Sequence, residues 1–297
     1  METETKKFRK DWFKITKRVS LPINKEKVDD HFVPKEIVFE DNKKLLEQIA
    51  VAISWRMPIL LVGETGTGKT SLVRHLAFST KNAFVRVNFN GGTTVEDLVG
   101  RWLLIDGKTV WVDGLLVMAM KKGYWFHADE INAASAEINF VLHSLLDDDG
   151  RIVLAEKGDE VVIPHPNFRF FAAMNPPTEY AGVKELNKAL MSRFMVAKVD
   201  FPPPKVEQKI LVSRTGIAEE VAERMVRCAG EIRTMHGSED VRYVMSTRDL
   251  LQWATMFKVY KKYLVSAEMT VLNKVGSDDF EAIKDIMSLS FKAIDVG

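Results

Sequence analysis

The sequence has few of the features that mark secreted or membrane-bound proteins. Its 297 residues include one cysteine, Cys228, so no disulfide can form within the chain. The cysteine lies in an apolar stretch with helical spacing, where we expect a small buried side chain. The N-terminus contains no apolar run of signal-peptide length, and no segment approaches the ~20 apolar residues of a membrane span. We therefore expect a soluble cytoplasmic protein.

An excess of charge of either sign is also missing. The 42 basic and 41 acidic residues give a net charge of +1. This balance provides no general attraction to nucleic acid or to an anionic membrane, although a local basic patch could still bind either. Nucleic acid is therefore an open but not a favoured partner. The hydrophobic fraction of 46% is typical of a globular protein with a sizeable core.

Residues 1–34 differ from the rest and are interpreted as an N-terminal arm. Basic and aromatic side chains are interleaved along its first part. A helix there would place Phe8, Trp12 and Ile15 on one side. The arm would contact nucleic acid, lipid or a partner, or it would pack its aromatic residues on its own domain or a neighbouring subunit. We favour packing.

Residues 35–200 are predicted to form an α/β domain. Short apolar runs alternate with helical stretches, as in a parallel sheet covered by helices on both faces. Thr93 with Glu96 matches the capping box that begins a helix. The predicted strands are Pro58–Val62, Ala83–Phe89, Tyr124–Ala128 and Phe168–Met174.

Two hairpin insertions are predicted within this domain. Trp102–Ile105 and Thr109–Val112 flank Asp106-Gly107, a pair typical of two-residue hairpin turns. Arg151–Ala155 and Glu160–Pro164 flank a short loop that contains a glycine.

A proline-rich break separates this domain from a helical one. Residues 201–204 read Phe-Pro-Pro-Pro, which predicts a stiff linker. Residues 205–297 are expected to form a small α-helical domain, in which Ser246 begins a helix and Asp249 completes its capping box. Apolar side chains at helical spacing in this part include Ile217, Val221, Met225, Cys228 and Ile232.

The segment from Gly63 to Thr70 fits the phosphate-loop pattern G-x-x-x-x-G-K-[ST] in full. A predicted strand enters it and a predicted helix leaves it, so backbone N–H groups and the positive end of the helix would face phosphate. Lys69 would reach the β- and γ-phosphates, and Thr70 would hold Mg²⁺. The candidate nucleotide-binding residues are Gly63, Glu64, Thr65, Gly66, Thr67, Gly68, Lys69, Thr70 and Ser71.

Polar residues follow two other predicted strands. Asp129 and Glu130 end one of them, where the aspartate could bind Mg²⁺ and the glutamate could polarise the attacking water. Asn175 ends the next and could hold that water, although Asn-Pro alone also marks a turn. His127, within the first of these strands, is expected to be a packed core side chain.

Taken together, these motifs resemble a known family of ATPases. GETGTGKT, WFHADEIN, FAAMNPP, ALMSRF and STRDL occur in this order and are similar to the motifs of AAA+ ATPases. The resemblance is closer to the MoxR branch, which includes the CbbQ, NirQ and GvpN proteins and the ATPase subunit of cobaltochelatase. It covers roughly residues 35–265.

The resemblance implies an α/β core, a helical lid and a ring of identical subunits, usually six, with ATP bound between subunits. Asn175 would be sensor one, and Arg193 would be the arginine finger that reaches the neighbouring subunit's ATP. Arg248 would be sensor two in the lid. Beside these, Lys69, Thr70, Asp129 and Glu130 would act from one subunit.

The resemblance also suggests where a partner binds. The two hairpins match insertions that face the pore or a partner in related ATPases, which makes Trp102, Lys108 and Trp111 candidate contact residues; packing roles for both tryptophans fit equally well. Members of the family commonly work with a separate protein that carries a von Willebrand A-type domain. We expect a similar partner because this chain leaves no room for such a domain after the lid.

Three functions compete on the sequence alone. The favoured one is an ATP-driven remodelling chaperone that activates or assembles a client. The second is a nucleic-acid motor or the nucleotide-driven subunit of a restriction system of the McrB type, some of which use GTP. The third is a nucleotide-gated scaffold with little turnover, which Glu130, Asn175 and Arg193 argue against.

Overall fold

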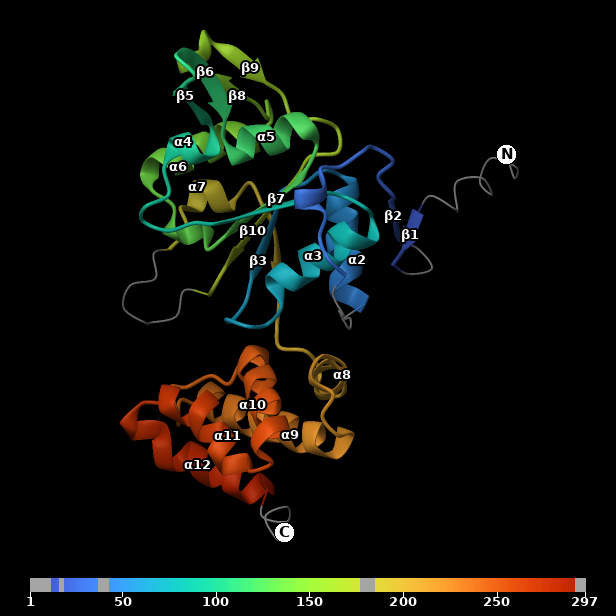
Figure 1. Cartoon of the computed structure of the whole chain (residues 1–297), viewed down its shortest axis with the longest axis vertical. Coiled ribbons are helices and arrows are strands. Elements are labelled where there is room, and N and C mark those ends of the chain that lie inside the picture. Colours follow the sequence, from blue (N-terminus) through green and yellow to red (C-terminus); the bar gives the residue numbers. More distant parts are fainter. Residues whose placement is uncertain (1–11, 16–18, 37–42, 177–184, 292–297) are drawn as a thin grey trace, which may run out of the picture. The chain divides into compact units, whose positions relative to one another are not determined.

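The computed structural model describes residues 12–15, 19–36, 43–176 and 185–291. By their backbone contacts they divide into two compact units (Figure 1). The first ends at Val199 and the second begins at Asp200, and the five residues Glu64–Gly68 are grouped with the second.

The described part of the N-terminal arm is extended. Strand β1 (Trp12–Lys14) pairs antiparallel with β2 (Ser20–Pro22), so the helical arrangement considered for Trp12 and Ile15 is wrong for this strand; Phe8 lies outside the described residues. The Phe13 ring packs edge-on against His75 with 6.2 Å between centroids. At least this aromatic residue therefore packs on the chain's own α/β unit.

A parallel five-stranded sheet forms the centre of the first unit, in the order β11-β3-β10-β7-β4. The strands are β3 (Ile59–Val62), β4 (Phe84–Asn88), β7 (Trp125–Asp129), β10 (Arg169–Met174) and β11 (Met195–Lys198).

The sequence predicted four of these strands and missed β11, which lies at the edge of the sheet. Along β11 the side chains of Val196 and Lys198 are exposed while Ala197 is buried. An edge strand with one solvated side has no continuous apolar run, and such a run was the signal used for the others.

Helices surround the sheet and supply most of the remaining core. Leu60, Phe126 and Ala172 from the sheet are fully buried and belong to one cluster with side chains of the neighbouring helices. The helices of this unit are α2 (Lys43–Ser54), α3 (Lys69–Ser79), α4 (Val95–Leu98), α5 (Leu115–Lys122), α6 (Ala136–Leu146) and α7 (Lys188–Met191).

The capping box of α4 differs from the prediction by one residue. Thr94, not Thr93, is the N-cap, and Asp97, not Glu96, completes the box. The Thr93 hydroxyl instead accepts a hydrogen bond from the Asn90 N–H at 3.0 Å. Two adjacent threonines, each followed three residues later by an acidic residue, satisfy the same pattern, and the preceding turn selects between them.

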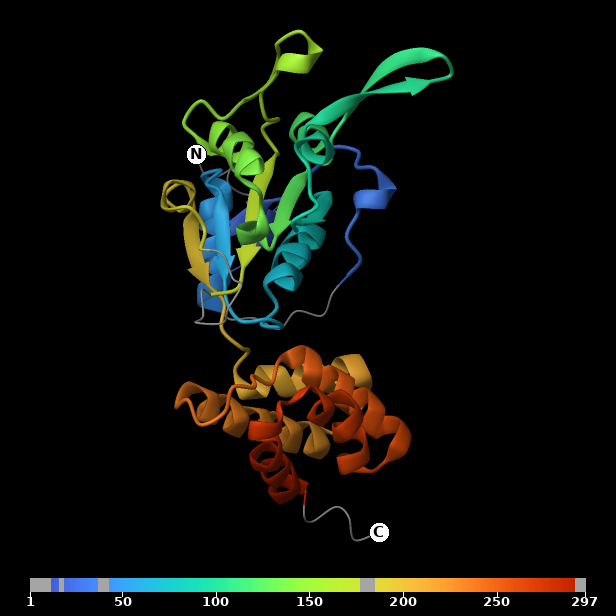
Figure 2. The same ribbon diagram turned by 90° about the vertical axis from the view of Figure 1, so that its left-hand side faces the viewer.

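Both predicted hairpins are confirmed: β5 (Gly100–Ile105) pairs with β6 (Lys108–Asp113), and β8 (Ile152–Leu154) pairs with β9 (Glu160–Val162). In the two views they project beyond the same end of the first unit (Figures 1 and 2).

A hydrogen bond of 2.9 Å from Trp102 Nε1 to the Glu156 carbonyl joins the two hairpins. Trp102 packs edge-on against Trp111, yet about half of its surface stays exposed. Trp111 is mostly covered and donates to Asp113 Oδ1 at 2.8 Å. Trp111 therefore has the packing role that was one of its two interpretations, whereas Trp102 is both anchored and accessible.

The second unit is helical. Its helices are α8 (Pro204–Thr215), α9 (Glu219–Gly237), α10 (Thr247–Tyr260), α11 (Tyr263–Thr270) and α12 (Ser277–Phe291). Trp253, Phe291 and Cys228 are fully buried in their shared core. The Ser246–Asp249 capping box is confirmed.

One boundary is displaced relative to the sequence prediction: α8 begins at Pro204, inside the predicted linker, because a proline is tolerated in the first turn of a helix. In the part of the chain that the structure describes, none of the helices has the length and apolar character needed to cross a bilayer.

Candidate functional site

The phosphate-loop pattern lies between β3 and α3, as its sequence context predicted. Gly66 and Gly68 have φ angles of +83° and +96°. These left-handed conformations favour glycine because a Cβ would clash with the backbone. Thr67 Oγ1 donates to the Glu64 carbonyl at 2.9 Å and closes the turn. The pattern of glycines is therefore required by the conformation of the backbone.

Lys69 is the first residue of α3, and its side chain is largely buried. Its Nζ donates to the Gly63 carbonyl at 2.6 Å and to Asn175 Oδ1 at 3.1 Å. Asn175 directly follows β10, the strand next to β3 in the sheet. An ammonium group at a strand end, beside a glycine-rich turn, is well placed to bind an anion.

Thr70 and Asp129, the two predicted metal ligands, are in contact. Thr70 Oγ1 donates to Asp129 Oδ2 at 3.2 Å, and Asp129 is the last residue of the fully buried strand β7. A hydroxyl and a carboxylate are oxygen ligands of the kind that Mg²⁺ prefers. The donor set therefore fits a magnesium ion held next to a bound triphosphate.

The structure adds one residue that the sequence did not point to. Arg86, on the edge strand β4, donates to Asp129 Oδ2 through Nε at 3.0 Å and also through Nη2. Burial by itself raises the pKa of Asp129, but the neighbouring His127 and the charge and hydrogen bonds of Arg86 outweigh it, so the pKa is lowered below its usual value. An arginine in a half-exposed strand carries no sequence signal that separates it from a surface charge.

His127 lies two residues before Asp129 and is fully buried, as expected for a core side chain. Its ring packs beside that of Phe84, with 5.7 Å between centroids. Burial lowers its pKa to about 4, so the imidazole is neutral at pH 7.

Glu130 follows Asp129 but leaves the strand direction. Its φ of +55° is left-handed, which is uncommon for a residue with a side chain and costs on the order of 1 kcal/mol. Its carbonyl accepts from the Ala133 N–H at 2.8 Å and begins a short 3-10 turn, Ile131–Ala133. The strained turn places Glu130 at the surface, directly after a buried strand.

Arg193 is held away from the phosphate-loop residues within its own chain. It donates to the Ala189 carbonyl at 2.6 Å and forms an ion pair with Asp147 at 3.4 Å. Its Nε is buried without a hydrogen-bond partner among the described residues. The structure thus brings together Lys69, Thr70, Asp129 and Asn175, but it does not add Arg193 to them.

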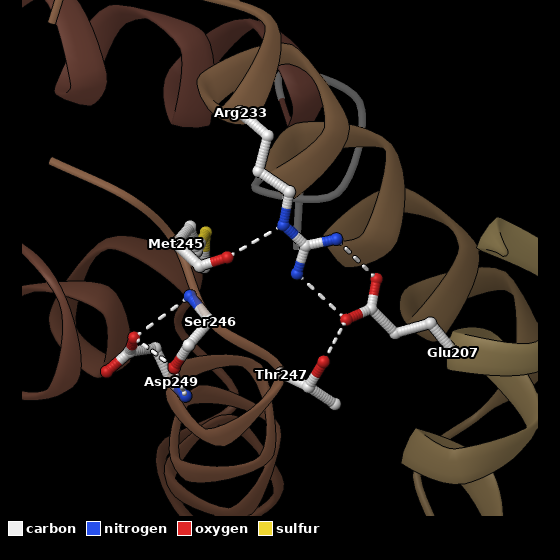
Figure 3. Close-up of polar contacts among 6 residues, drawn as sticks. All are labelled: Glu207, Arg233, Met245, Ser246, Thr247 and Asp249. Carbon is white, nitrogen blue, oxygen red and sulfur yellow. Dashed lines mark hydrogen bonds and ion pairs between the residues drawn. The ribbon is translucent and has the colours of Figure 1, made fainter. Parts of the chain in front are cut away.

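Arg248, the predicted sensor two, belongs to the second unit and is exposed in the first turn of α10. A buried network fixes this turn (Figure 3). Arg233 donates to both carboxylate oxygens of Glu207 at 2.8 Å and to the Met245 carbonyl at 2.8 Å. Thr247, which directly precedes Arg248, donates to Glu207 Oε1 at 2.5 Å.

Comparison with known proteins agrees with this geometry. The model of the "AAA domain (dynein-related subfamily)" matches residues 58–194, and that of "CbbQ/NirQ/NorQ C-terminal" matches residues 207–290. The protein NorQ of Paracoccus denitrificans is 34% identical over 200 residues, which cover 67% of this chain and 73% of NorQ. The protein CbbQ of Hydrogenophilus thermoluteolus is 31% identical, covering 78% of this chain and 86% of CbbQ.

Midasin of Dictyostelium discoideum is 38% identical over 219 residues, but the chain spans only 4% of midasin's length. The two matched domains, in this order, and the coverage of NorQ and CbbQ define the class. The chain belongs to the AAA+ ATPases and, within them, to the MoxR branch that contains the CbbQ, NirQ and NorQ proteins. It is therefore a nucleotide-binding enzyme that hydrolyses ATP.

Proposed function

We propose that the chain is an ATP-driven remodelling chaperone that works as a ring of six identical subunits on a partner protein. Two neighbouring contacts at the carboxyl ends of the strands carry this proposal: Lys69 with Asn175, and Thr70 with Asp129. Arg193 instead forms an ion pair with Asp147. Such a site has the parts for binding and water activation, while Arg193 has its described contacts with Ala189 and Asp147 and not with these residues.

In the proposed mechanism Lys69 exchanges the Gly63 carbonyl for the phosphates of ATP. Thr70 and Asp129 hold Mg²⁺, which supplies positive charge to the phosphate oxygens. Glu130 takes the proton of the attacking water, and Asn175 orients that water. Each of these roles requires a side chain at the carboxyl edge of the sheet.

Arg193 would complete the site of the neighbouring subunit. An arginine brought across an interface neutralises charge in the transition state and makes hydrolysis depend on assembly. Its ion-pair partner Asp147 is exposed, so solvent screens the pair and weakens the hold of Asp147 on Arg193. In the same scheme Arg248 senses the nucleotide from the lid.

Exposed apolar side chains on the hairpins support a protein partner. Exposed apolar side chains mark protein–protein contact more often than contact with nucleic acid, which is read by cationic groups. We propose that these hairpins, with Lys108, contact the client or a partner that carries a von Willebrand A-type domain. The exposed residues are Trp102, Leu104, Ile105, Val110, Val112, Val153, Val161 and Ile163.

The first test is the ATPase rate per subunit as a function of protein concentration, with Mg²⁺ and no client. We expect the rate to climb and then level off, because the sites are completed between subunits. A constant rate down to dilutions at which the protein is shown to be monomeric would contradict the ring.

A mixing experiment tests Arg193 directly. Arg193→Ala subunits should be inactive alone and should lower the turnover of wild-type subunits in a mixture, since they leave a neighbour's site incomplete. Wild-type turnover that is unaffected by the variant would mean that Arg193 does not act in trans. Turnover stimulated by DNA, and lost at high salt, would favour the nucleic-acid motor instead.

A further inference from the structure

Asp129 has a positively charged partner although it is a proposed ligand of a cation. Its Oδ2 accepts from Arg86 through both Nε and Nη2, and from the Thr70 hydroxyl at 3.2 Å. The Thr70 bond is compatible with a metal ion, because a hydroxyl that donates its proton keeps lone pairs for a ligand. Arg86 cannot bind a metal ion in this way, because a guanidinium only donates hydrogen bonds and has no lone pair to offer.

The burial of the two partners is unequal. The Asp129 side chain is 12% exposed, whereas that of Arg86 is 49% exposed. A buried carboxylate without a counter-charge is strongly destabilising, so Asp129 needs a cation whenever no metal is bound. Arg86 comes from the edge strand β4 and can return to solvent at small cost, because an exposed guanidinium is well hydrated.

We propose that Arg86 is a positioning residue that serves as the counter-cation of Asp129 in the metal-free site and yields the carboxylate to Mg²⁺ when the metal arrives with nucleotide. This inference rests on the proposed assignment of Thr70 and Asp129 as metal ligands. It assigns Arg86 no contact with the reacting atoms.

Two consequences follow from the charges. With Arg86 in place, Asp129 is neutralised, so the phosphates of metal-free ATP meet little repulsion. With Arg86→Gln, the carboxylate repels metal-free ATP and attracts Mg²⁺ without competition. The ratio of the nucleotide dissociation constant in EDTA to that in Mg²⁺ should therefore rise about tenfold or more in Arg86→Gln.

The experiment measures binding, not turnover. A fluorescent non-hydrolysable ATP analogue is titrated into the full chain in EDTA and in Mg²⁺, for wild type, Arg86→Gln and Arg86→Lys. Arg101→Gln is the matched control, because it removes the same charge from an exposed position of the β5–β6 hairpin. Thermal melting without nucleotide shows whether each variant is folded.

Arg86→Lys should raise the ratio less than Arg86→Gln does, because lysine keeps the charge but cannot donate two parallel hydrogen bonds. Arg101→Gln should leave the ratio at the wild-type value. The Asp129→Asn variant provides the background for a double-mutant cycle. In that background Arg86→Gln should not weaken the binding of metal-free nucleotide, because position 129 no longer carries a carboxylate that repels phosphate.

A merely structural role of Arg86 would weaken binding equally in both buffers and leave the ratio unchanged. That result overturns the proposal, as does weakened metal-free binding that persists in Asp129→Asn. If Arg86→Gln does not fold, Arg86→Lys decides, and an unchanged ratio overturns the proposal. Wild-type protein that binds no nucleotide even with Mg²⁺ would instead contradict the proposed function itself.

Discussion

Cys228 illustrates how burial sets the chemistry of a single side chain. It is fully buried in the core of the helical unit, and burial raises the pKa of its thiol to about 12, from an ordinary value of 9.0. The thiolate is the reactive form, so alkylation of the folded protein by iodoacetamide at pH 8.5 should be about a thousandfold slower than alkylation in urea. Mass spectrometry of timed samples measures both rates.

The same shift has a consequence for stability. The unfolded chain loses the thiol proton above about pH 9, whereas the folded chain keeps it to about pH 12. The contribution of Cys228 is therefore complete below pH 9 and is lost as the pH rises from 9 toward 12. Cys228→Ala should flatten that part of the stability profile. Equal labelling rates in the native and unfolded protein would show that the thiol is accessible.

For single residues, the sequence predicted which side chains the strand ends bring together but not the charged group that pairs with Asp129. Lys69, Thr70 and Asp129 could be found because motifs fix their distance from a strand end, and the contacts among them follow from the parallel sheet. Arg86 could not be found, because its role depends on the register that sets β4 beside β7, with Asn88 opposite Asp129. No local pattern encodes that register.

Among the secondary-structure elements, helix α10 depends on a buried ion pair in the helical unit. The Glu207 side chain is 1% exposed and is held by Arg233, whose guanidinium also lies 3.9 Å from the centroid of the Phe201 ring. Arg233→Met would leave a buried carboxylate without a counter-charge, so we expect a loss of about 3–5 kcal/mol in the free energy of unfolding. Urea unfolding followed by circular dichroism measures it.

Arg224 supplies the matched control on the same helix, α9. It pairs with Glu220, whose side chain is 75% exposed, so Arg224→Met should cost less than about 1 kcal/mol. Replacing both Glu207 and Arg233 with methionine should recover much of the loss, because no buried charge then remains. Similar losses for Arg224→Met and Arg233→Met would mean that burial adds nothing to the Glu207–Arg233 pair.

Elements were predictable where their signal is local. Asp106-Gly107 fixed the β5–β6 hairpin because both residues adopt positive φ angles, +49° and +74°, that suit a two-residue turn. The start of α4 was wrong by one residue because two overlapping capping patterns compete there. Strand β11 was missed because its four residues, two of them exposed, form no apolar run, whereas the other edge strand, β4, lies within the longer segment Ala83–Phe89.

For the whole molecule, family membership indicates how residues in different parts of the chain act together. AAA+ proteins are generally oligomeric, and the two matched domains divide the chain so that Lys69 falls in the first and Arg248 in the second. The motifs could predict this organisation because they are spaced along the sequence. The client could not be predicted, because exposed apolar hairpin residues specify a kind of surface and not one partner.

The variant Glu130→Gln tests ATP hydrolysis and ring assembly in the same protein. Glutamine keeps the size of the side chain but cannot accept the proton of the attacking water, so turnover should fall at least about a hundredfold. Nucleotide binding should persist, because Lys69, Thr70 and Asp129 are untouched. With ATP and Mg²⁺ the variant should therefore accumulate as the assembled ring, at protein concentrations where wild type is partly dissociated.

Analytical ultracentrifugation with ATP, compared with ADP, measures the assembled fraction, and a phosphate-release assay measures turnover. Glu223→Gln, an exposed charge on α9, is the control and should behave as wild type in both. Normal turnover in Glu130→Gln would remove this residue from the mechanism. Lost turnover without a gain in assembly would separate hydrolysis from ring formation, and the interface would then have to form independently of bound ATP.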